Sequence, residues 1–354
     1  MAETIKKEVL TRLKEGGFIP AHPLALNEDL TIDEASQRRL TRYYISCGVD
    51  GIAIGVHTTQ FEIRDPEYSY FERVLAIAAD EIARSGAGSS FIKVAGICGP
   101  VQQAVKEAEI AVSLGYDLGL LSMGGLDNLS EDELIARAKA VARVIPVFGF
   151  YLQPSVGGRV FSYSFWEEFC KIDHIYAIKA APFNRYYTLD VIRAVCNSPR
   201  NNEIALYTGN DDNIVLDLIT PYSIKADNRL VEKRFAGGLL GHFAVWTKKS
   251  VELFHFIKEG LRENSLNHEE ILKIAGEITD MNGALFDVAN NFKGSISGIH
   301  EILRRQGLMK GTWCLNPREQ LSKGQSEELD RVTSQYARWT DDEYVKLFIV
   351  NDKG

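Results

Sequence analysis

A lysine follows a short apolar run near the middle of the chain, at Ile175-Tyr-Ala-Ile-Lys179. A free lysine, with a pKa of about 10.4, is protonated at neutral pH, and an apolar surrounding lowers that pKa and releases the neutral amine. A neutral amine attacks carbonyl groups, and the imine that results acts as an electron sink when a neighbouring bond breaks. Lys179 is therefore a candidate Schiff-base residue. The alternative is a lysine whose stem packs on the fold and whose ammonium group reaches solvent.

A tyrosine ends the preceding apolar run, at Val147-Phe-Gly-Phe-Tyr151. Side chains alternate between the two faces of a strand, so Tyr151 and Lys179 lie side by side if their strands are neighbours and both side chains point inward. A phenol in that place relays protons to and from a substrate held as an imine. The alternative is an ordinary core aromatic residue.

These two runs belong to a series of eight short runs rich in Val, Ile and Phe, separated by amphipathic stretches. The runs cover residues 18–21, 51–55, 91–97, 118–122, 147–151, 175–179, 204–207 and 238–241. Alternation of this kind is typical of repeated βα units and a parallel sheet. Eight units predict an α/β fold, the (β/α)₈ TIM barrel, over residues 1–247. A doubly wound open sheet is the competing architecture, and the glycine-rich phosphate turn that would favour it is missing.

The region after the barrel has helical periodicity. Apolar residues recur at three- and four-residue spacing in 251–261, 269–278 and 299–305, which predicts a C-terminal helical region over residues 248–354, packed on the barrel. Residues 225–234, before the last strand, are a polar insertion or a helix. Capping boxes are expected at Thr31/Glu34, Ser130/Glu133 and Ser164/Glu167, an N-cap at Asp65 before Pro66, and a helix end at Gly115.

Composition narrows the function classes. The net charge of −8 and the lack of basic runs argue against nucleic acid as a partner and favour a small molecule. The seven histidines show no spacing typical of metal ligands, so no metal is expected. The first eight residues lack an apolar signal core and no apolar stretch is long enough to span a membrane, so we expect a cytoplasmic protein with no membrane partner.

The sequence resembles the dihydrodipicolinate synthase and N-acetylneuraminate lyase family, whose strand-five motif is Tyr-Asn-x-Pro and whose strand-six motif is Gly-Ile-Lys. Here the motifs read Tyr151-Leu-Gln-Pro154 and Ala177-Ile-Lys179, and the similarity runs from about Gly17 to about Leu321. The resemblance implies a class I aldolase fold, Lys179 as Schiff-base lysine and Tyr151 as proton relay. It also implies no cofactor beyond the covalent imine, and a homo-oligomer, dimer or tetramer.

The resemblance further implies where substrate is held. The family binds the keto acid's carboxylate through a Gly-Thr-Thr-Gly-Glu turn, in whose place this chain has Gly55-Val-His-Thr-Thr-Gln-Phe61. Two alignments are possible, one using His57 and Thr58 and the other Thr58 and Thr59; a plain polar loop is the alternative. Gly209-Asn-Asp-Asp212 resembles the lyase turn that accepts hydrogen bonds from sugar hydroxyls, with Asp211 and Asp212 as acceptors, or else caps the next helix. His242 contacts substrate or is structural.

Two departures argue against dihydrodipicolinate synthesis itself. Where the synthases have Pro-Tyr-Tyr after strand four, this chain has Ser122-Met-Gly-Gly-Leu126. The synthases' arginine two residues after the strand-five proline is replaced by Val156, and Arg159 follows three residues later. We therefore expect a Schiff-base lyase, aldolase or dehydratase that acts on pyruvate or a 2-keto sugar acid through Lys179. The alternative is a non-catalytic keto-acid or sugar-acid binding or regulatory protein on the same barrel.

Overall fold

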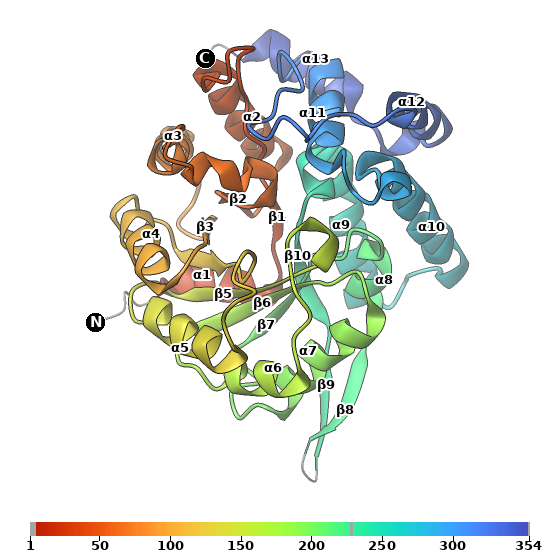
Figure 1. Cartoon of the computed structure of the whole chain (residues 1–354). Helices are drawn as coiled ribbons and strands as arrows, with labels where there is room; N and C mark the ends of the chain where they lie inside the picture. Colours follow the sequence, from red (N-terminus) through yellow and green to blue (C-terminus); the bar gives the residue numbers. More distant parts are fainter. Residues whose placement is uncertain (1–4, 227–228, 353–354) are drawn as a thin grey trace. The chain divides into compact units, whose positions relative to one another are not determined.

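The structure, a computed structural model, describes residues 5–226 and 229–352 (Figure 1). The expectations for the N-terminal segment and for the insertion at 225–234 therefore extend partly outside the described residues. The chain divides into two compact units. Unit 1 comprises Met1–Gly17 and Ser89–Leu239, and unit 2 comprises Phe18–Gly88 and Leu240–Gly354.

Unit 1 contains six parallel strands, in the spatial order β10-β7-β6-β5-β4-β3. Their bounds are β3 Ile92–Ile97, β4 Leu118–Leu121, β5 Val147–Leu152, β6 Ile175–Ala181, β7 Ala205–Thr208 and β10 Phe235–Leu240. Almost every residue in these strands is buried, as expected for a parallel sheet covered on both faces.

Helices alternate with the strands of unit 1. They are α1 Lys7–Glu15, α4 Val101–Ser113, α5 Glu131–Ala142, α6 Tyr163–Cys170, α7 Arg185–Asn197 and α8 Ile214–Ile219. Figure 1 shows α4 to α7 outside the strands that they connect. Gly149 of β5 makes room for one of them, because a Cβ atom there would lie 2.6 Å from Cε1 of Phe169 on α6. The face of β5 that carries Gly149 is therefore the face that α6 covers.

The polar segment before the last strand of unit 1 is an insertion, as predicted, but it is not helical. Strand β8 (Tyr222–Ala226) pairs antiparallel with β9 (Arg229–Lys233). Exposed and partly buried positions alternate along β8, a pattern that suits a two-stranded ribbon with one solvent-exposed face. The polar side chains of 225–226 and 229–233 thus belong to an exposed ribbon and not to an exposed helix.

Unit 2 begins with the first two strands, β1 (Phe18–Pro20) and β2 (Gly51–Ile54), which are linked by a parallel bridge between Ala21 and Ala53. The other elements of unit 2 near its start are α2 Glu34–Cys47, η1 His57–Thr59, η2 Phe61–Arg64 and α3 Phe71–Arg84. Its C-terminal elements are η4 His242–Ala244, α9 Thr247–Glu263, α10 His268–Leu285, η5 Val288–Asn290, α11 Ser295–Arg305, α12 Gln325–Gln335, η6 Ala337–Trp339 and α13 Asp342–Asn351.

The predicted (β/α)₈ barrel with C-terminal helices is confirmed, since eight parallel strands alternate with helices and all eight predicted runs are strands. Helix α9 begins at Thr247, close to the predicted limit of the barrel, and that domain boundary stays a prediction. Of the predicted helix starts only the capping box of Ser130 and Glu133 forms. The N-caps are Asp33 for α2 and Ser162 for α6, and α3 begins at Phe71, well after Asp65.

Candidate functional site

Lys179 lies near the carboxyl end of β6 and is only 8% exposed. Burial lowers the pKa of its ammonium group from 10.5 to about 8, and the negative charge of Asp211 opposes that shift. The Nζ atom is 4.5 Å from the centre of the Phe150 ring, whose residue pairs with Lys179 across β5 and β6. Because an aromatic face attracts a cation, this contact with Phe150 favours the charged form.

The turn after β7 lies directly against the stem of Lys179. A Cβ atom at Gly209 would lie 2.4 Å from Cε of Lys179 and 2.7 Å from Cβ of Ala181, so no side chain fits there. The amide N–H of Gly209 donates to the carbonyl oxygen of Ala180 at 2.8 Å, which fixes the turn to β6. Gly209 is therefore needed for close approach, a role that its place in the motif did not reveal.

The two aspartates of this turn have different surroundings. Asp211 is 8% exposed, and its charge acts on Lys179. Asp212 instead faces Arg185 at the start of α7, with 3.9 Å between Oδ1 and a guanidinium nitrogen. Burial raises the pKa of the Asp212 carboxyl, and Arg185 partly offsets this effect. Of the pair, Asp211 is thus the one associated with the amine.

A buried carboxylate that the sequence analysis missed holds the turn in place. Asp217 on α8 is fully buried and accepts hydrogen bonds from the Thr208 hydroxyl at 2.7 Å and from the Asn210 side-chain amide at 2.9 Å. It also accepts from Asn213 at 2.9 Å and forms an ion pair with Arg185. A charge buried in this way is stable only when such donors surround it. The turn that contacts Lys179 is therefore a preorganised structure.

Asn210 extends this network to the end of β6. Its side-chain oxygen accepts from the amide of Phe183 at 3.1 Å. Phe183 has a φ of +49°, a left-handed conformation that strains a residue with a bulky side chain. Strained residues of this kind persist only where the surroundings hold them, and they concentrate at functional sites.

Tyr151 does not lie beside Lys179, which corrects the expectation that the two side chains share a face. Val147 pairs with Ile175, but Phe148 pairs with Ala177, so β6 has one extra residue at Tyr176. This bulge places Phe150 opposite Lys179 and moves Tyr151 to the other face of the sheet.

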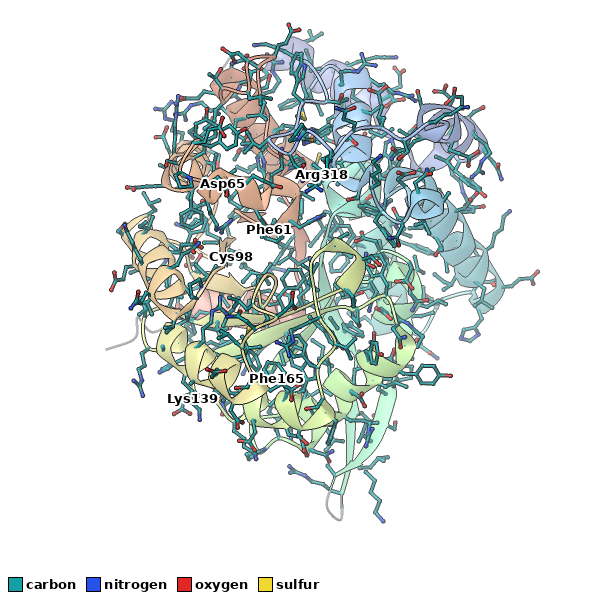
Figure 2. All side chains as sticks on the ribbon, viewed as in Figure 1. Phe61, Asp65, Cys98, Lys139, Phe165 and Arg318 are labelled. Atoms are coloured by element: carbon teal, nitrogen blue, oxygen red, sulfur yellow. The ribbon has the colours of Figure 1, made fainter. Side chains whose placement is uncertain are left out.

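The surroundings of Tyr151 agree with that register. Its ring centre is 5.1 Å from that of Trp166 on α6 and 6.1 Å from that of Tyr187 on α7. Its hydroxyl accepts from the amide of Phe161 at 3.3 Å, and burial raises its pKa to about 12. Figure 2 labels Phe165 on α6, another member of this aromatic cluster. The phenol thus packs between the sheet and its helices, and its role as a proton relay stays a prediction.

In unit 2, the turn after β2 is closed by its threonines. The Thr58 hydroxyl donates to the carbonyl of Ala21 at 2.8 Å, and the Thr59 hydroxyl donates to the carbonyl of His22 at 2.7 Å. Both side chains are buried and tie η1 to the segment after β1. The hydroxyl protons are thus already used, whereas the amide N–H of Thr58 has no hydrogen-bond partner in the described part of the chain.

Two further side chains, His57 and Gln60, belong to this turn. The ring of His57 lies 5.8 Å from that of Phe61. Gln60 is 1% exposed, and its side-chain oxygen accepts from the amide of Leu315 at 2.6 Å. Its side-chain nitrogen is buried without a partner among the described residues. Buried donors are seldom left unsatisfied, so this amide is a candidate ligand contact that the sequence analysis did not select.

His242 in η4 is buried, and its Nδ1 atom lies 2.6 Å from the side-chain oxygen of Asn282. An amide oxygen only accepts, so Nδ1 carries the proton. Burial lowers the pKa of His242 to about 4, with the Asn282 hydrogen bond opposing the shift, so the ring is neutral at physiological pH. This environment suits a structural histidine, and a contact between His242 and substrate stays a prediction.

The site residues are thus distributed between the two units. Lys179, Gly209 and Asp211 lie together in unit 1, and Tyr151 is on the opposite face of the same sheet. His57, Thr58, Thr59 and His242 belong to unit 2. In the described residues no three His, Cys, Asp or Glu side chains are grouped as metal ligands, and no helix is long and apolar enough to cross a bilayer.

Neither protein-family profiles nor curated protein sequences match this chain significantly. Solved structures do match. A dihydrodipicolinate synthase from Oceanobacillus iheyensis has a TM-score of 0.73 at 17% identity, covering 94% of this chain and 99% of its own. An N-acetylneuraminate lyase from Fusobacterium nucleatum has a TM-score of 0.68 at 20% identity, covering 91% and 99%. A prophage protein of the dihydrodipicolinic acid synthase family from E. coli K12, solved with pyruvate, has a TM-score of 0.72 at 17% identity, covering 90% and 98%. These matches confirm the fold that the resemblance implied.

Proposed function

We propose that this protein forms a Schiff base between Nζ of Lys179 and the keto carbon of a 2-keto acid, and acts as a lyase, aldolase or dehydratase on pyruvate or a 2-keto sugar acid. The observation that carries the proposal is the burial of Lys179, with its pKa lowered to about 8. At pH 8 about half of such a lysine is the neutral nucleophile, against roughly 0.3% for a free lysine.

The chemistry follows from the neutral amine. The amine attacks the keto carbon. The carbonyl oxygen then leaves as water with one proton from the amine and one from solvent, and the imine nitrogen retains the amine's other proton. The protonated imine then takes up the electron pair that is released when a neighbouring C–C bond breaks or a C–H proton departs. In a dehydration, the enamine formed by loss of the C–H proton returns its electron pair and expels a hydroxyl group from the next carbon. Asp211 is the charged partner for this cation, since its charge already acts on Lys179. No cofactor is required for these steps.

The remaining roles are assigned by the surroundings of each group. In the turn after β2, the amide of Thr58 and the side-chain nitrogen of Gln60, which has no partner among the described residues, are donors suited to a carboxylate. Asp211 would also accept from hydroxyls of a sugar acid, while Asp212 is engaged with Arg185. The relatives whose names include dihydrodipicolinate synthase and N-acetylneuraminate lyase, and the one solved with pyruvate, support a keto acid as substrate.

Borohydride reduction tests the proposal directly, because it converts a reversible imine into a stable amine. The protein is incubated with pyruvate, or with a 2-keto sugar acid, then reduced, digested and analysed by mass spectrometry. We expect the adduct on Lys179, its loss in Lys179→Met, and its retention in Lys139→Met, which alters an exposed lysine on α5. Adduct formation at other lysines only, or with none of several keto acids, would overturn the proposal.

A second candidate function is a keto-acid or sugar-acid binding or regulatory protein without turnover. The position of Tyr151 favours it, since the side chain opposite Lys179 is the phenyl ring of Phe150 and not a phenol. A non-catalytic protein would be stabilised thermally by keto acids to the same extent in the parent and in Lys179→Ala, with no adduct and no product. Loss of that stabilisation in Lys179→Ala would exclude this alternative. A homo-oligomer remains a prediction, which sedimentation measurements would test.

A further inference from the structure

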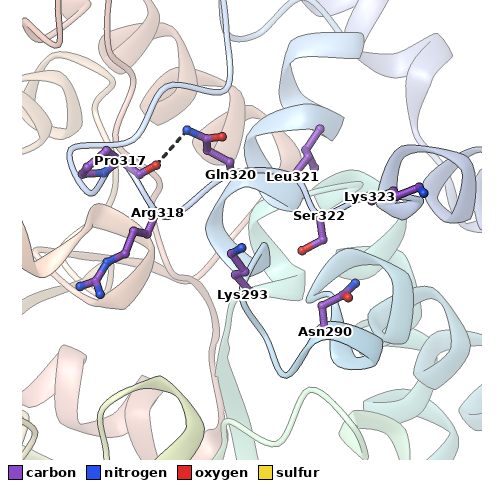
Figure 3. A pocket seen from close by; sticks show the side chains of 8 residues that line it. All are labelled: Asn290, Lys293, Pro317, Arg318, Gln320, Leu321, Ser322 and Lys323. Carbon is purple, nitrogen blue, oxygen red and sulfur yellow. Dashed lines mark hydrogen bonds between the residues drawn. The ribbon is translucent and has the colours of Figure 1, made fainter.

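Unit 2 contains a cleft whose lining is strongly basic. The cleft has a volume of about 410 Å³, within the range of small-molecule sites. Its polar lining residues are Asn290, Lys293, Arg318, Gln320, Ser322 and Lys323. Asn290, the last residue of η5, and Lys293 lie in the segment before α11, and the others lie in the loop before α12; Figure 3 shows these side chains. This feature, the basic cleft, involves none of the residues assigned above to keto-acid chemistry.

The three cations of the basic cleft have no acidic partners in the part of the chain that the structure describes, since Lys293, Arg318 and Lys323 appear in none of its ion pairs. The chain as a whole has 48 acidic and 40 basic residues. A cleft with three cations and no carboxylate in its lining therefore runs against the charge balance of the protein. Its potential favours an anion.

Two carboxylates adjoin the lining residues, and both accept hydrogen bonds. Asp287 is buried and accepts from the Asn290 side-chain amide at 2.6 Å, the Gly294 amide at 3.0 Å and the Ser322 hydroxyl at 2.5 Å. Glu319 accepts from the amides of Ile296 at 2.8 Å and Ser297 at 3.3 Å, in the first turn of α11. Neither carboxylate is among the lining residues, and neither forms an ion pair with a cation of the cleft in the described residues.

The two loops that form the basic cleft are fastened to each other. Asp287 joins them through Asn290 and Ser322, as described above. Gln325 is buried and joins them again: its side-chain nitrogen donates to the carbonyl of Gly294 at 2.9 Å, and its oxygen accepts from the Ser322 amide at 3.1 Å. The first loop also holds Phe292 at a φ of +64°. Backbone held in this way fixes the positions from which the three cationic side chains extend, which lowers the entropic cost of ordering the loops around a ligand.

We propose that the basic cleft binds a small phosphorylated molecule. A phosphate monoester or diphosphate has two or more negative charges, and its oxygens diverge from each phosphorus atom, so cations from two loops can contact it at once. Arg318 supplies a planar fork, while Lys293 and Lys323 act as point charges. A single carboxylate has one negative charge and two oxygens in one plane, so it would leave some cations of the basic cleft without a contact.

Calorimetric titration of the full chain with inorganic pyrophosphate at low ionic strength tests this proposal. The test variant is Lys293→Gln/Arg318→Gln. The matched control is Lys273→Gln/Arg262→Gln, which also removes one lysine and one arginine, from exposed positions on α10 and α9. Both lysines and both arginines are exposed, so the variants should fold, which circular dichroism checks.

We expect the test variant to bind pyrophosphate roughly tenfold or more weakly than the parent, because it loses two charged donors, and the control to bind within about twofold of the parent. A weakening of less than about fivefold relative to the control, or no binding by the parent, would overturn the proposal. Tighter binding of succinate than of pyrophosphate would overturn the assignment to phosphate. The outcome is independent of the reaction at Lys179, because no keto acid is present.

Discussion

Replacing Lys179 by methionine should stabilise the folded protein at neutral pH while abolishing adduct formation. Lowering the pKa of the buried ammonium from 10.5 to about 8 corresponds to about 3 kcal/mol of free energy by which the folded state disfavours the charge. Methionine has a similar length and no charge to bury. Because Asp211 loses its partner in the variant, we expect a net gain of about 1–3 kcal/mol in the free energy of unfolding.

The pH dependence identifies the cause of that gain. The folded-state pKa of Lys179 lies below the value of an unfolded lysine, so the unfolded state binds more protons between about pH 8 and 10.5. The penalty is therefore complete below pH 8 and disappears as the pH rises through this window. The difference in stability between Lys179→Met and the parent should be largest near pH 7 and should shrink towards pH 10.

Urea unfolding followed by tryptophan fluorescence, at pH 7 and at pH 10, measures both effects. Other titrating groups are common to the two proteins and cancel in the difference. Lys139→Met is the control, and we expect it to change stability by less than about 0.5 kcal/mol, because Lys139 is exposed. A Lys179→Met protein that is less stable than the parent at pH 7, or a difference that does not change with pH, would refute the reasoning.

Three further substitutions test other parts of the site. Tyr151→Phe removes a hydroxyl that accepts a hydrogen bond from the amide of Phe161. It should lower the free energy of unfolding by about 1 kcal/mol and leave the rate of adduct formation within about twofold of the parent. A large loss of rate would support the relay role. Asp217→Ala removes the shared acceptor of a buried network. We expect the free energy of unfolding to fall by about 3–5 kcal/mol in the same assay. A fall of less than about 1 kcal/mol would contradict the structural role of Asp217. Gly209→Ala places a methyl group 2.4 Å from Cε of Lys179. It should lower the free energy of unfolding by about 1–3 kcal/mol and slow adduct formation. An unchanged rate of adduct formation would show that the lysine stem is free to move.

The sequence was sufficient to predict the eight strands and the end of β6, because parallel strands buried on both faces read as compact apolar runs. It was also sufficient to select Lys179, a single cation at the end of such a run. It was insufficient to place Tyr151. Alternation predicts faces within one strand, but the pairing of two strands depends on their register, and the extra residue at Tyr176 inverts the relation between them.

The local polar contacts were harder to predict for a related reason. Several residues near each helix start have suitable side chains, and the backbone geometry selects among them, as with Asp33 over Thr31 and Ser162 over Ser164. The Asp217 network has no spacing signal at all, because its donors come from β7, the following turn and α7. Such networks depend on tertiary packing that only the folded chain displays.

The phenyl ring opposite Lys179 also bears on how this barrel can change over generations. Phenylalanine and tyrosine codons differ at a single base, so one mutation at position 150 would introduce a phenol where an apolar wall now stands. One base change would therefore add a proton-donating group beside Lys179, without any change in the strands or the turns of the barrel. Selection for a new substrate could therefore begin at Phe150 and leave the lysine, its aspartate and their supporting network untouched.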